Sequence, residues 1–510
     1  MDVIIAGAGP TGLTLALELA RRGVPCRIVD RAARPFAGSR GKGLQPRTQE
    51  VFDDLGVADE LIAAGGPYPE LRMYDGPTVL GVRVMFPHAE ATPDVPYPNL
   101  LMVPQWRTEQ ALRDRLARFG VRVEYGTALT AFEPGPAGIA VTLTRAGATE
   151  RVEAGYLVGA DGGRSTVRKA LAVGFAGETL ERHRALIGDV GVDRLSRDRW
   201  HVWPHAAGGA VSLCPLPGTD SFQFTVQLTG EDSGELTGDL TLPALQRIVA
   251  ERTGRDDLRL RDLTFAAPYR VNVRMIDRYR VGRVFLAGDA AHVHSPAGGQ
   301  GLNTGVQDAY NLGWKLAHVL AGAPAELLDS YESERLPVAA DVLGISSALL
   351  RQGLAGRRGV DTQQLLLSYR GGPLAPAGER DGDGDGVRAG DRAPDAPGHD
   401  PGGAPTRLFD AFRGPHATLL ALGPDHVETA GRLAARYGPI VRVAAFVDTA
   451  GHARRAYRID RGLVLVRPDG YIGAVGAGVA DVLARIAPER SRSADVGGQG
   501  TKVASGRDAR

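Results

Sequence analysis

The chain begins with a strand–turn–helix pattern that constrains its fold more than any other feature. The apolar run at residues 3–6 predicts a buried parallel strand, and Gly7, Gly9 and Gly12 follow it in the spacing G-x-G-x-x-G. In this pattern the first glycine permits a tight turn and the second lets the backbone approach a pyrophosphate. The third lets the next helix, expected at about 11–22, pack against the strand. We therefore predict a dinucleotide-binding unit.

An acidic residue completes this unit. A second strand at residues 27–29 ends at Asp30, where a carboxylate can accept hydrogen bonds from both hydroxyls of an adenosine ribose. The pyrophosphate would lie at the N-terminus of the first helix, because free N–H groups and the helix dipole favour an anion there. Strand, glycines, helix and acid occur together, which favours nucleotide binding over a glycine-rich structural turn.

Composition restricts the class of protein. A chain of 510 residues should form two or three domains, and its net charge of +1 argues against nucleic acid or an anionic membrane as the main partner. Cys26 and Cys214 are the two cysteines, too few for a disulfide framework or a metal cage, so we predict no metal site. No apolar run approaches the roughly 18 residues of a membrane span, and we expect a cytoplasmic protein.

Two further strand ends carry acidic residues. A buried strand at 156–159 leads to Asp161-Gly162, and Ser165 is placed to cap the short helix that follows. A strand near 283–287 leads to Gly288-Asp289, then to a glycine-rich loop and a helix from about Leu302 to Leu320. The N-terminus of that helix is suited to a negatively polarised ligand atom.

The segment 174–275 alternates strands with loops and is rich in aromatic residues. It could form one wall of an apolar pocket, although each aromatic side chain could equally be core. We predict Trp203, Phe222, Phe224 and Pro296 as substrate contacts. We assign no essential general base, and His294 and His201 are the candidate catalytic residues.

The C-terminal part begins after a region rich in Gly, Pro and Asp. Its run of alternating Asp and Gly at 381–386 is similar to a calcium loop, but position 12 is Arg392 where such a loop needs Glu. We therefore interpret 371–392 as a linker. A small α/β unit is predicted at 393–487, followed by a disordered tail at 488–510.

Taken together, the three strand-end motifs resemble those of the single-component FAD-dependent aromatic hydroxylases, the family of para-hydroxybenzoate hydroxylase and phenol hydroxylase. The resemblance implies that Asp30 binds the adenosine ribose and Asp289 the ribityl chain. It also implies that Arg40 and Gln105 contact the flavin and that Pro296 to Asn303 lies beside its pyrimidine ring. The full set of predicted cofactor contacts is Gly7, Gly9, Pro10, Thr11, Gly12, Asp30, Arg31, Arg40, Gln105, Leu129, Asp161, Arg164, Gly288, Asp289, Pro296, Gly298, Gly299, Gly301, Leu302 and Asn303.

The C-terminal unit resembles the thioredoxin-like domain of the subgroup that includes phenol hydroxylase, rifampicin monooxygenase and aromatic polyketide hydroxylases. It contains no cysteine, so it cannot perform thiol redox chemistry. The expected fold is α/β: a Rossmann-like FAD-binding domain, an inserted mixed β-sheet substrate domain and a C-terminal thioredoxin-like domain. The expected FAD domain comprises 1–67, 104–173 and 276–370, and the substrate domain comprises 68–103 and 174–275.

The family resemblance also implies an activity. FAD would be bound non-covalently, and hydroxylation of an electron-rich phenolic substrate, such as a polyketide, would proceed through a flavin C4a-hydroperoxide formed from dioxygen. The chain has no second strand–GxGxxG–helix unit, so NADPH or NADH is predicted to bind transiently. A monomer or homodimer is expected.

Other functions remain compatible with these motifs. One is a different FAD enzyme, such as an epoxidase, a Baeyer–Villiger-type oxygenase, a drug-inactivating monooxygenase or a halogenase. The spacing of Trp200 and Trp203 differs from the halogenase pattern W-x-W-x-I-P. Another is a non-catalytic flavoprotein that sequesters a flat aromatic drug.

Overall fold

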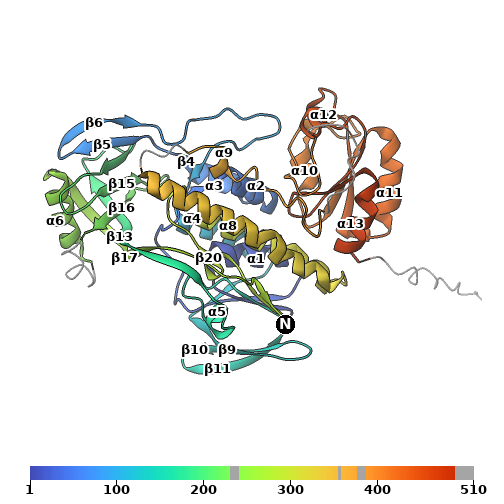
Figure 1. The fold of residues 1–510 in the computed structure, drawn as a ribbon, viewed down its shortest axis with the longest axis horizontal. Helices are drawn as coiled ribbons and strands as arrows, with labels where there is room; N and C mark the ends of the chain where they lie inside the picture. The colour runs from blue at the N-terminus through green and yellow to red at the C-terminus, as the bar shows by residue number, and fades with distance from the viewer. Residues whose placement is uncertain (230–239, 354–357, 376–385, 489–510) are drawn as a thin grey trace, which may run out of the picture.

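The computed structural model contains a central α/β body, a β-sheet with one covering helix at one end, and a small α/β unit at the other (Figure 1). Most of the calcium-like acidic run, at 381–385, lies outside the described residues, as does all of the predicted disordered tail except Pro488. The described residues are 1–229, 240–353, 358–375 and 386–488, without the side chains of 181–183.

The central body is built on a six-stranded sheet in which β1 (Val3–Ala6) lies between two parallel neighbours, β2 (Cys26–Asp30) and β12 (Tyr156–Gly159). The carboxyl ends of these strands carry the glycine motif, Asp30 and Asp161, so the predicted binding residues meet at one edge of the sheet. The remaining strands are β8 (Val123–Tyr125), β18 (Arg280–Val281) and β19 (Val284–Leu286).

The glycine motif is required by close packing. Gly7 has φ +104°, and a Cβ there would lie 2.2 Å from the Ala160 carbonyl oxygen. A Cβ on Gly12 would lie 1.9 Å from the Gly7 oxygen, so only glycine lets α1 (Pro10–Ala20) start this close to β1. Helix α7 (Gly301–Leu320) packs on α1 and leads, through a short turn, to the long α8 (Asp329–Gln352) that crosses the front of Figure 1.

Other elements of the central body are short helices and hairpins around this sheet. They are β3 (Gly43–Leu44), α2 (Pro46–Leu55), α3 (Ala58–Ala64), β4 (Gly66–Pro67), β7 (Leu101–Met102), α4 (Gln105–Ala117), β9 (Thr127–Pro134), β10 (Ile139–Arg145), β11 (Ala148–Ala154), α5 (Thr166–Ala170), the 3-10 turns η3 (Gly288–Ala290) and η4 (Ala325–Leu328), and α9 (Val360–Gln363).

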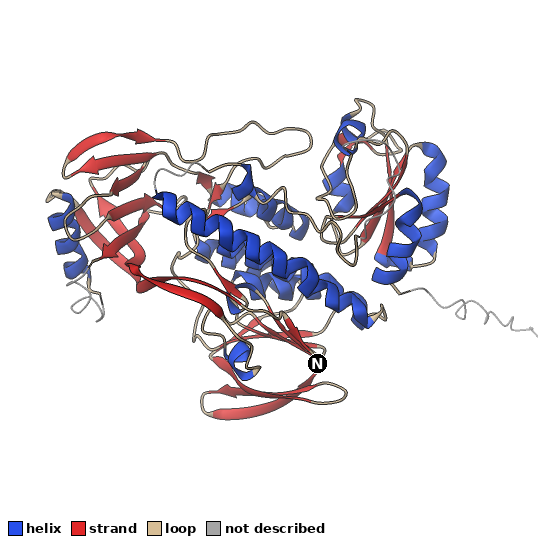
Figure 2. Ribbon diagram, in the orientation of Figure 1, coloured by secondary structure: helices blue, strands red, loops and turns tan. Residues whose placement is uncertain are grey.

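A second sheet of eight strands lies beside the central body, and helix α6 (Leu242–Thr253) covers one of its faces (Figure 2). Its strand order is β20-β17-β13-β16-β15-β14-β5-β6, so the 71–83 hairpin joins the sheet formed by the later segment. The strands are β5 (Leu71–Asp75), β6 (Thr78–Arg83), β13 (Ala176–Asp193), β14 (Trp200–Trp203), β15 (Val211–Pro215), β16 (Ser221–Leu228), β17 (Arg259–Met275) and β20 (His292–Val293).

The C-terminal unit has a four-stranded sheet in the order β24-β23-β25-β26, with β23 and β24 parallel and the other pairs antiparallel. This agrees with the expected thioredoxin-like domain. Its elements are β21 (Pro397–His399), β22 (Pro405–Arg407), α10 (Leu408–Phe412), β23 (Ala417–Leu422), η6 (Pro424–His426), α11 (Val427–Ala435), η7 (Gly438–Ile440), β24 (Val441–Phe446), α12 (His452–Tyr457), β25 (Gly462–Val466), β26 (Ile472–Val475), η8 (Gly476–Gly478) and α13 (Val479–Ile486).

The C-terminal unit is packed tightly against the central body. Trp314 of α7 and Leu327 of η4 belong to the same apolar cluster as Leu419 and Leu465 of the C-terminal sheet. A second contact is made by Arg392, which pairs with Glu50 of α2 although it lies at the end of the predicted linker. The unit therefore shares a core with the rest of the chain.

Within the described ranges no helix is long and apolar enough to cross a membrane.

Candidate cofactor and substrate site

Asp30 is held at the mouth of the first turn. Its carboxylate accepts hydrogen bonds from the backbone N–H of Ala8 at 2.8 Å and of Ala32 at 2.8 Å. A carboxylate offers about four lone-pair directions, so two remain for ribose hydroxyls. Next to it, a Cβ on Gly9 would meet no atom within 4 Å, which leaves this side of the turn open for a ligand.

Asp289 lies in the turn η3, directly after β19. Its side chain is accessible to water, yet many protein atoms surround it. This crowding by protein raises the pKa of Asp289, whereas the charges of His292 and Arg40 lower it. Burial, and then the charge of Asp289, raise the pKa of Tyr269 to about 12. Asp289, Arg40 and Tyr269 therefore lie close to one another, and Tyr269 is a site residue that the sequence did not single out.

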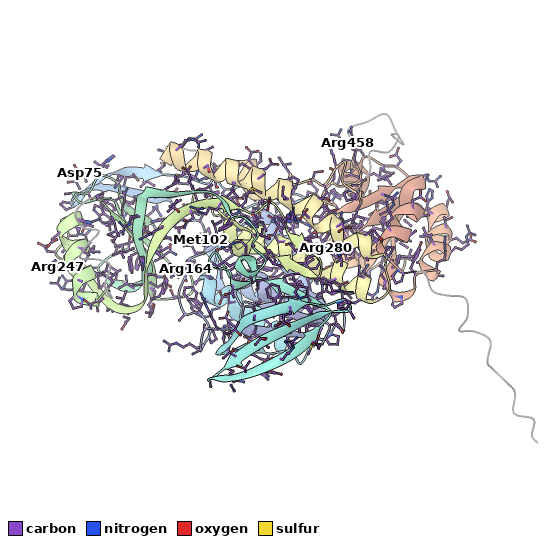
Figure 3. The ribbon with its side chains drawn as sticks, turned by 60° about the horizontal axis from the view of Figure 1, so that its bottom comes forward. Asp75, Met102, Arg164, Arg247, Arg280 and Arg458 are labelled. Carbon is purple, nitrogen blue, oxygen red and sulfur yellow. The ribbon has the colours of Figure 1, made fainter. Side chains whose placement is uncertain are left out.

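Asp161 accepts hydrogen bonds from the first N–H groups of α5, whose N-cap is Ser165 as predicted. One carboxylate oxygen accepts from the N–H of Thr166 at 2.6 Å, and the other is buried without a hydrogen-bond partner among the described residues. Arg164 is exposed near the middle of the molecule (Figure 3). Arg168 was not predicted, yet its guanidinium donates to the carbonyl oxygens of Ala290 at 2.9 Å and Gly163 at 2.8 Å. It thereby ties the Asp-Gly loop to the Gly-Asp turn.

The glycine-rich loop is fixed by Asn303 and by Gln45, a residue missed at the sequence level. Gln45 donates from its backbone to Asn303 Oδ1 at 2.8 Å and from its side chain to the Gly298 oxygen at 2.8 Å. Asn303 Nδ2 donates to the oxygens of Gly43 and Gly299, at 2.9 and 2.7 Å. These bonds occupy the Asn303 side chain, which leaves its backbone for a cofactor. Gly299 has φ +64°, and a Cβ on it would face open space apart from Gln45 Nε2 at 3.9 Å.

The N-terminus of α7 is free of side-chain caps. Its N-cap residue, Gln300, makes no capping bond, so the first N–H groups of the helix remain available to an electronegative ligand atom. Gln105 Oε1 accepts from the Gly41 N–H at 2.9 Å, and a Cβ on Gly41 would lie 3.0 Å from Leu302 Cδ1. These contacts bring the Arg40 segment, Gln105 and the start of α7 together. Pro296 is exposed in the preceding loop, and Gly301 is the first residue of α7.

Two of the other predicted contacts differ in burial. Leu129 of β9 is buried in the core of the central body, with 8% of its surface exposed. Arg31 is exposed beyond the end of β2. Pro10 and Thr11 begin α1, and the Thr11 hydroxyl would lie 2.5 Å from a Cβ on Gly288, so the first and third motifs are in contact.

The two candidate catalytic histidines differ in their surroundings. Both ring nitrogens of His201 are hydrogen-bonded, to the Tyr74 hydroxyl at 2.7 Å and the Ser196 carbonyl oxygen at 2.8 Å, so neither is free to act on a substrate. His294 Nε2 contacts His292 Nδ1 at 2.7 Å. Its other nitrogen is buried without a described partner, and burial holds the pKa of His294 well below its ordinary value.

The predicted substrate aromatics lie on the far face of their sheet. Trp203, Phe222 and Phe224 are at most 1% exposed and pack in the apolar cluster that α6 completes. Trp203 and Phe222 therefore contact core residues rather than an open pocket. Because side chains alternate along a strand, the neighbouring residues Trp200 and Gln223 face the central body instead.

The residues at this edge fit FAD. Four features lie around the carboxyl ends of the parallel strands: open space beside Gly9, an anchored acid at Asp30, an accessible acid at Asp289 and an uncapped helix at Gly301. A bound FAD needs each of these features: a pyrophosphate turn, a ribose acceptor, a ribityl acceptor and a helix dipole at the flavin.

Comparison with known proteins agrees with this site. Residues 1–346 match the family described as FAD binding domain, and residues 387–489 match that described as aromatic-ring hydroxylase, C-terminal. A flavin-dependent monooxygenase of Mycobacteroides abscessus is 50% identical over 95% of this chain and 100% of that protein. The 6-methylpretetramide 4-monooxygenase of Streptomyces rimosus is 36% identical over 95% of this chain and 93% of its own length.

A solved structure extends the likeness to three dimensions. The ternary complex of aklavinone-11 hydroxylase with FAD and aklavinone has a TM-score of 0.82 and 30% identity, and the alignment covers 95% of this chain and 98% of that one. FAD is thus the cofactor, and NAD(P)H is the co-substrate typical of these enzymes. The chain belongs to the FAD-dependent aromatic-ring hydroxylases and is a flavin-dependent monooxygenase.

Proposed function

We propose that this monooxygenase hydroxylates a phenolic, polycyclic aromatic compound of the polyketide type, using NAD(P)H and dioxygen. The observation that carries the proposal is the group of partly accessible aromatic side chains, Tyr68, Phe86 and Trp200, on the sheet face that looks toward the Gly41–Gln105 contact. A flat substrate can stack on such side chains beside the flavin. The names of relatives that act on 6-methylpretetramide and aklavinone support a fused-ring substrate.

The residues of the chain would divide the work as follows. Asp30 binds the adenosine ribose, and Asp289 binds the ribityl hydroxyls. Arg40 and Gln105 contact the cofactor near the start of α7, whose dipole stabilises negative charge there. FAD, when bound, supplies hydride acceptance and oxygen activation. We also propose a cytoplasmic monomer or homodimer.

The test is turnover with oxygen labelling. The purified yellow protein is given NADPH, ¹⁸O₂ and a panel of phenolic polyketides, tetracycline precursors and rifamycins. We expect substrate-stimulated NADPH oxidation and a product heavier by one ¹⁸O atom. Stimulated oxidation that returns all the oxygen as hydrogen peroxide with every compound would refute hydroxylation and favour the aromatic-binding alternative. Preference for a rifamycin over the phenolic polyketides would favour the drug-inactivating alternative.

A further inference from the structure

A cluster of aromatic and cationic side chains lies between the two large sheets. The Lys42 ammonium is 4.3 Å from the ring centroid of Trp200, whose centroid is 5.6 Å from that of Tyr68. Tyr68 in turn is 4.6 Å from Phe86. All four residues are partly accessible, and the three aromatic side chains pack on the apolar group that includes Met102, which Figure 3 labels between the sheet and the central body. We call Lys42, Tyr68, Phe86, Trp200 and Arg358 the aromatic–cation cluster.

Lys42 has no ion-pair partner among the described residues, and burial lowers the pKa of its ammonium. Its ammonium donates to the side-chain oxygen of Gln223, and no carboxylate of the described residues lies within ion-pair distance. The titratable groups that face it are Asp189 of β13 and Cys214 of β15. Burial raises the pKa of Asp189 to about 6 and that of the Cys214 thiol to about 11. At pH 7 the thiol is therefore neutral, whereas the Asp189 carboxylate, which lies beyond ion-pair distance, is mostly ionised and partly offsets the charge of Lys42. An ammonium has three donors, and two of them remain available.

Other donors of the cluster also lack partners. Trp200 Nε1 and Arg358 Nη1 are buried without a hydrogen bond to any described residue. Arg358 is close enough to Tyr68 to affect its pKa, so these donors surround the same pair of rings. Buried donors are rarely left unpaired, because each has lost its hydrogen bonds to water without replacement. The cluster is therefore complementary to a flat ligand that carries oxygen acceptors at its edge.

The cluster adjoins the predicted flavin position through the backbone of Lys42. The preceding residue, Gly41, donates to Gln105 and approaches Leu302, while the Lys42 carbonyl oxygen accepts from the Val103 N–H at 2.9 Å. The same short segment thus contacts the cofactor side with its backbone and the substrate side with its lysine. An oxygen bound by Lys42 would belong to a ring next to the flavin.

We propose that Lys42 binds an ionised hydroxyl of the substrate, a phenolate or enolate on the ring to be oxygenated, while Trp200 stacks on that ring and Arg358 takes a peripheral oxygen. This rests on the proposed function and names the recognition chemistry of its site. The phenol proton passes to Lys42 if the amine arrives neutral, and to solvent if it is already an ammonium. The resulting anion has a more electron-rich ring, which favours attack on an electrophilic oxygen.

The ionisation state of a bound dye tests this without turnover. Alizarin, a dihydroxyanthraquinone, changes colour when its hydroxyl ionises, and it is titrated with the oxidised holoenzyme in the absence of NADPH across a pH series. We expect bound alizarin to ionise at least one pH unit below free alizarin, a tenfold preference for the anion. Anthraquinone, which lacks hydroxyls, should bind more weakly.

Variants separate the lysine from its surroundings. Lys42→Met should abolish the colour shift, Lys42→Arg should keep most of it, and Lys169→Met, on the exposed end of α5, should change nothing. Flavin content and far-UV circular dichroism check that each variant is folded.

Several outcomes would overturn the assignment. They are wild-type protein that binds alizarin only in its neutral form, wild-type protein that does not bind it, and a folded Lys42→Met variant that keeps the full shift. The wild-type result decides the matter even if Lys42→Met fails to fold. A normal colour shift with no oxygenated product from any compound would refute the proposed function and leave this binding role intact.

Discussion

Arg467 holds the C-terminal unit to the central body through a fully buried ion cluster. It donates to both oxygens of Glu334 on α8, at 2.7 and 2.9 Å, and to both oxygens of Asp469, at 3.0 and 2.6 Å. Lys315 of α7 also donates to Glu334, at 2.7 Å. Two cations and two anions are therefore balanced where the exposed fraction of each side chain is at most 1%. Arg467→Met would remove one cation and leave a net negative charge buried.

The expected loss of stability is large. Four charge-assisted hydrogen bonds disappear together, and removing one partner of a buried ion pair typically costs about 3–5 kcal/mol. Desolvation by itself would raise the pKa of Glu334, but Arg467 and then Lys315 outweigh it and hold the pKa below its ordinary value. A carboxyl whose folded pKa is depressed contributes stability above its unfolded pKa and loses it as the pH falls toward the folded pKa. The penalty of Arg467→Met should therefore be largest near neutral pH and shrink below about pH 4.5, the unfolded value.

Urea unfolding of the holoprotein, followed by far-UV circular dichroism and tryptophan fluorescence, measures this. Trp314, 5.4 Å from the Arg467 guanidinium, reports on the interface. The double variant Arg467→Met, Asp469→Asn restores charge balance and should recover part of the loss, although it keeps the smaller side chain. A loss under about 1 kcal/mol for Arg467→Met at pH 7, or a double variant less stable than the single one, would refute the reasoning.

Three further predictions follow from the site. Asp289→Ala should weaken FAD binding about ten- to hundredfold, since lost charged hydrogen bonds cost about 1.5–3 kcal/mol; unchanged affinity in a fluorescence titration would show that Asp289 points away from the ribityl chain. Gly299→Val, at φ +64°, should leave a yellow protein that stopped-flow absorbance shows to be reduced slowly by NADPH, or one that releases hydrogen peroxide; normal reduction with full coupling would remove this loop from the flavin. Burial raises the pKa of Glu109 to about 7 from 4.5, so its contribution to stability is present below pH 4.5 and lost as the pH rises through 7. Glu109→Gln should therefore stabilise the protein by up to about 3 kcal/mol at pH 8 and by little at pH 4.5, and equal melting shifts at both pH values would contradict this.

The residues at the strand ends could be predicted because their constraint is local. Neighbouring residues within a dozen positions explain each of them. One is the glycine that brings α1 onto β1, and another is an acid at a strand end, such as Asp30. The same is true of the Gly288-Asp289 turn and of the glycine loop before α7. Tyr269, Arg168 and Gln45 could not be found in this way, since each reaches its partners from a distant part of the chain.

The substrate side shows why strand faces are harder to assign. The sequence places aromatic residues on both faces of β14 and on one face of β16, but this pattern does not reveal which face meets the cofactor. Helix α6 covers Trp203, Phe222 and Phe224, which leaves Trp200 and Gln223 on the inner face. The placement of one helix thus decided which of two equivalent sets became core.

The sequence by itself determined the family, the fold class and the cofactor, because each follows from short motifs with a local stereochemical cause. Only the tertiary structure decided that the C-terminal unit packs on the central body through a shared apolar cluster and buried ion pairs. The glycine- and proline-rich segment before it indicated a linker, yet Arg392 and Arg467 pair with Glu50 and Glu334 across the interface. It also decided that Lys42 faces Trp200. Such pairings depend on which surfaces meet. The desolvation penalty and the attraction of a buried ion pair arise only when folding has excluded water from both partners.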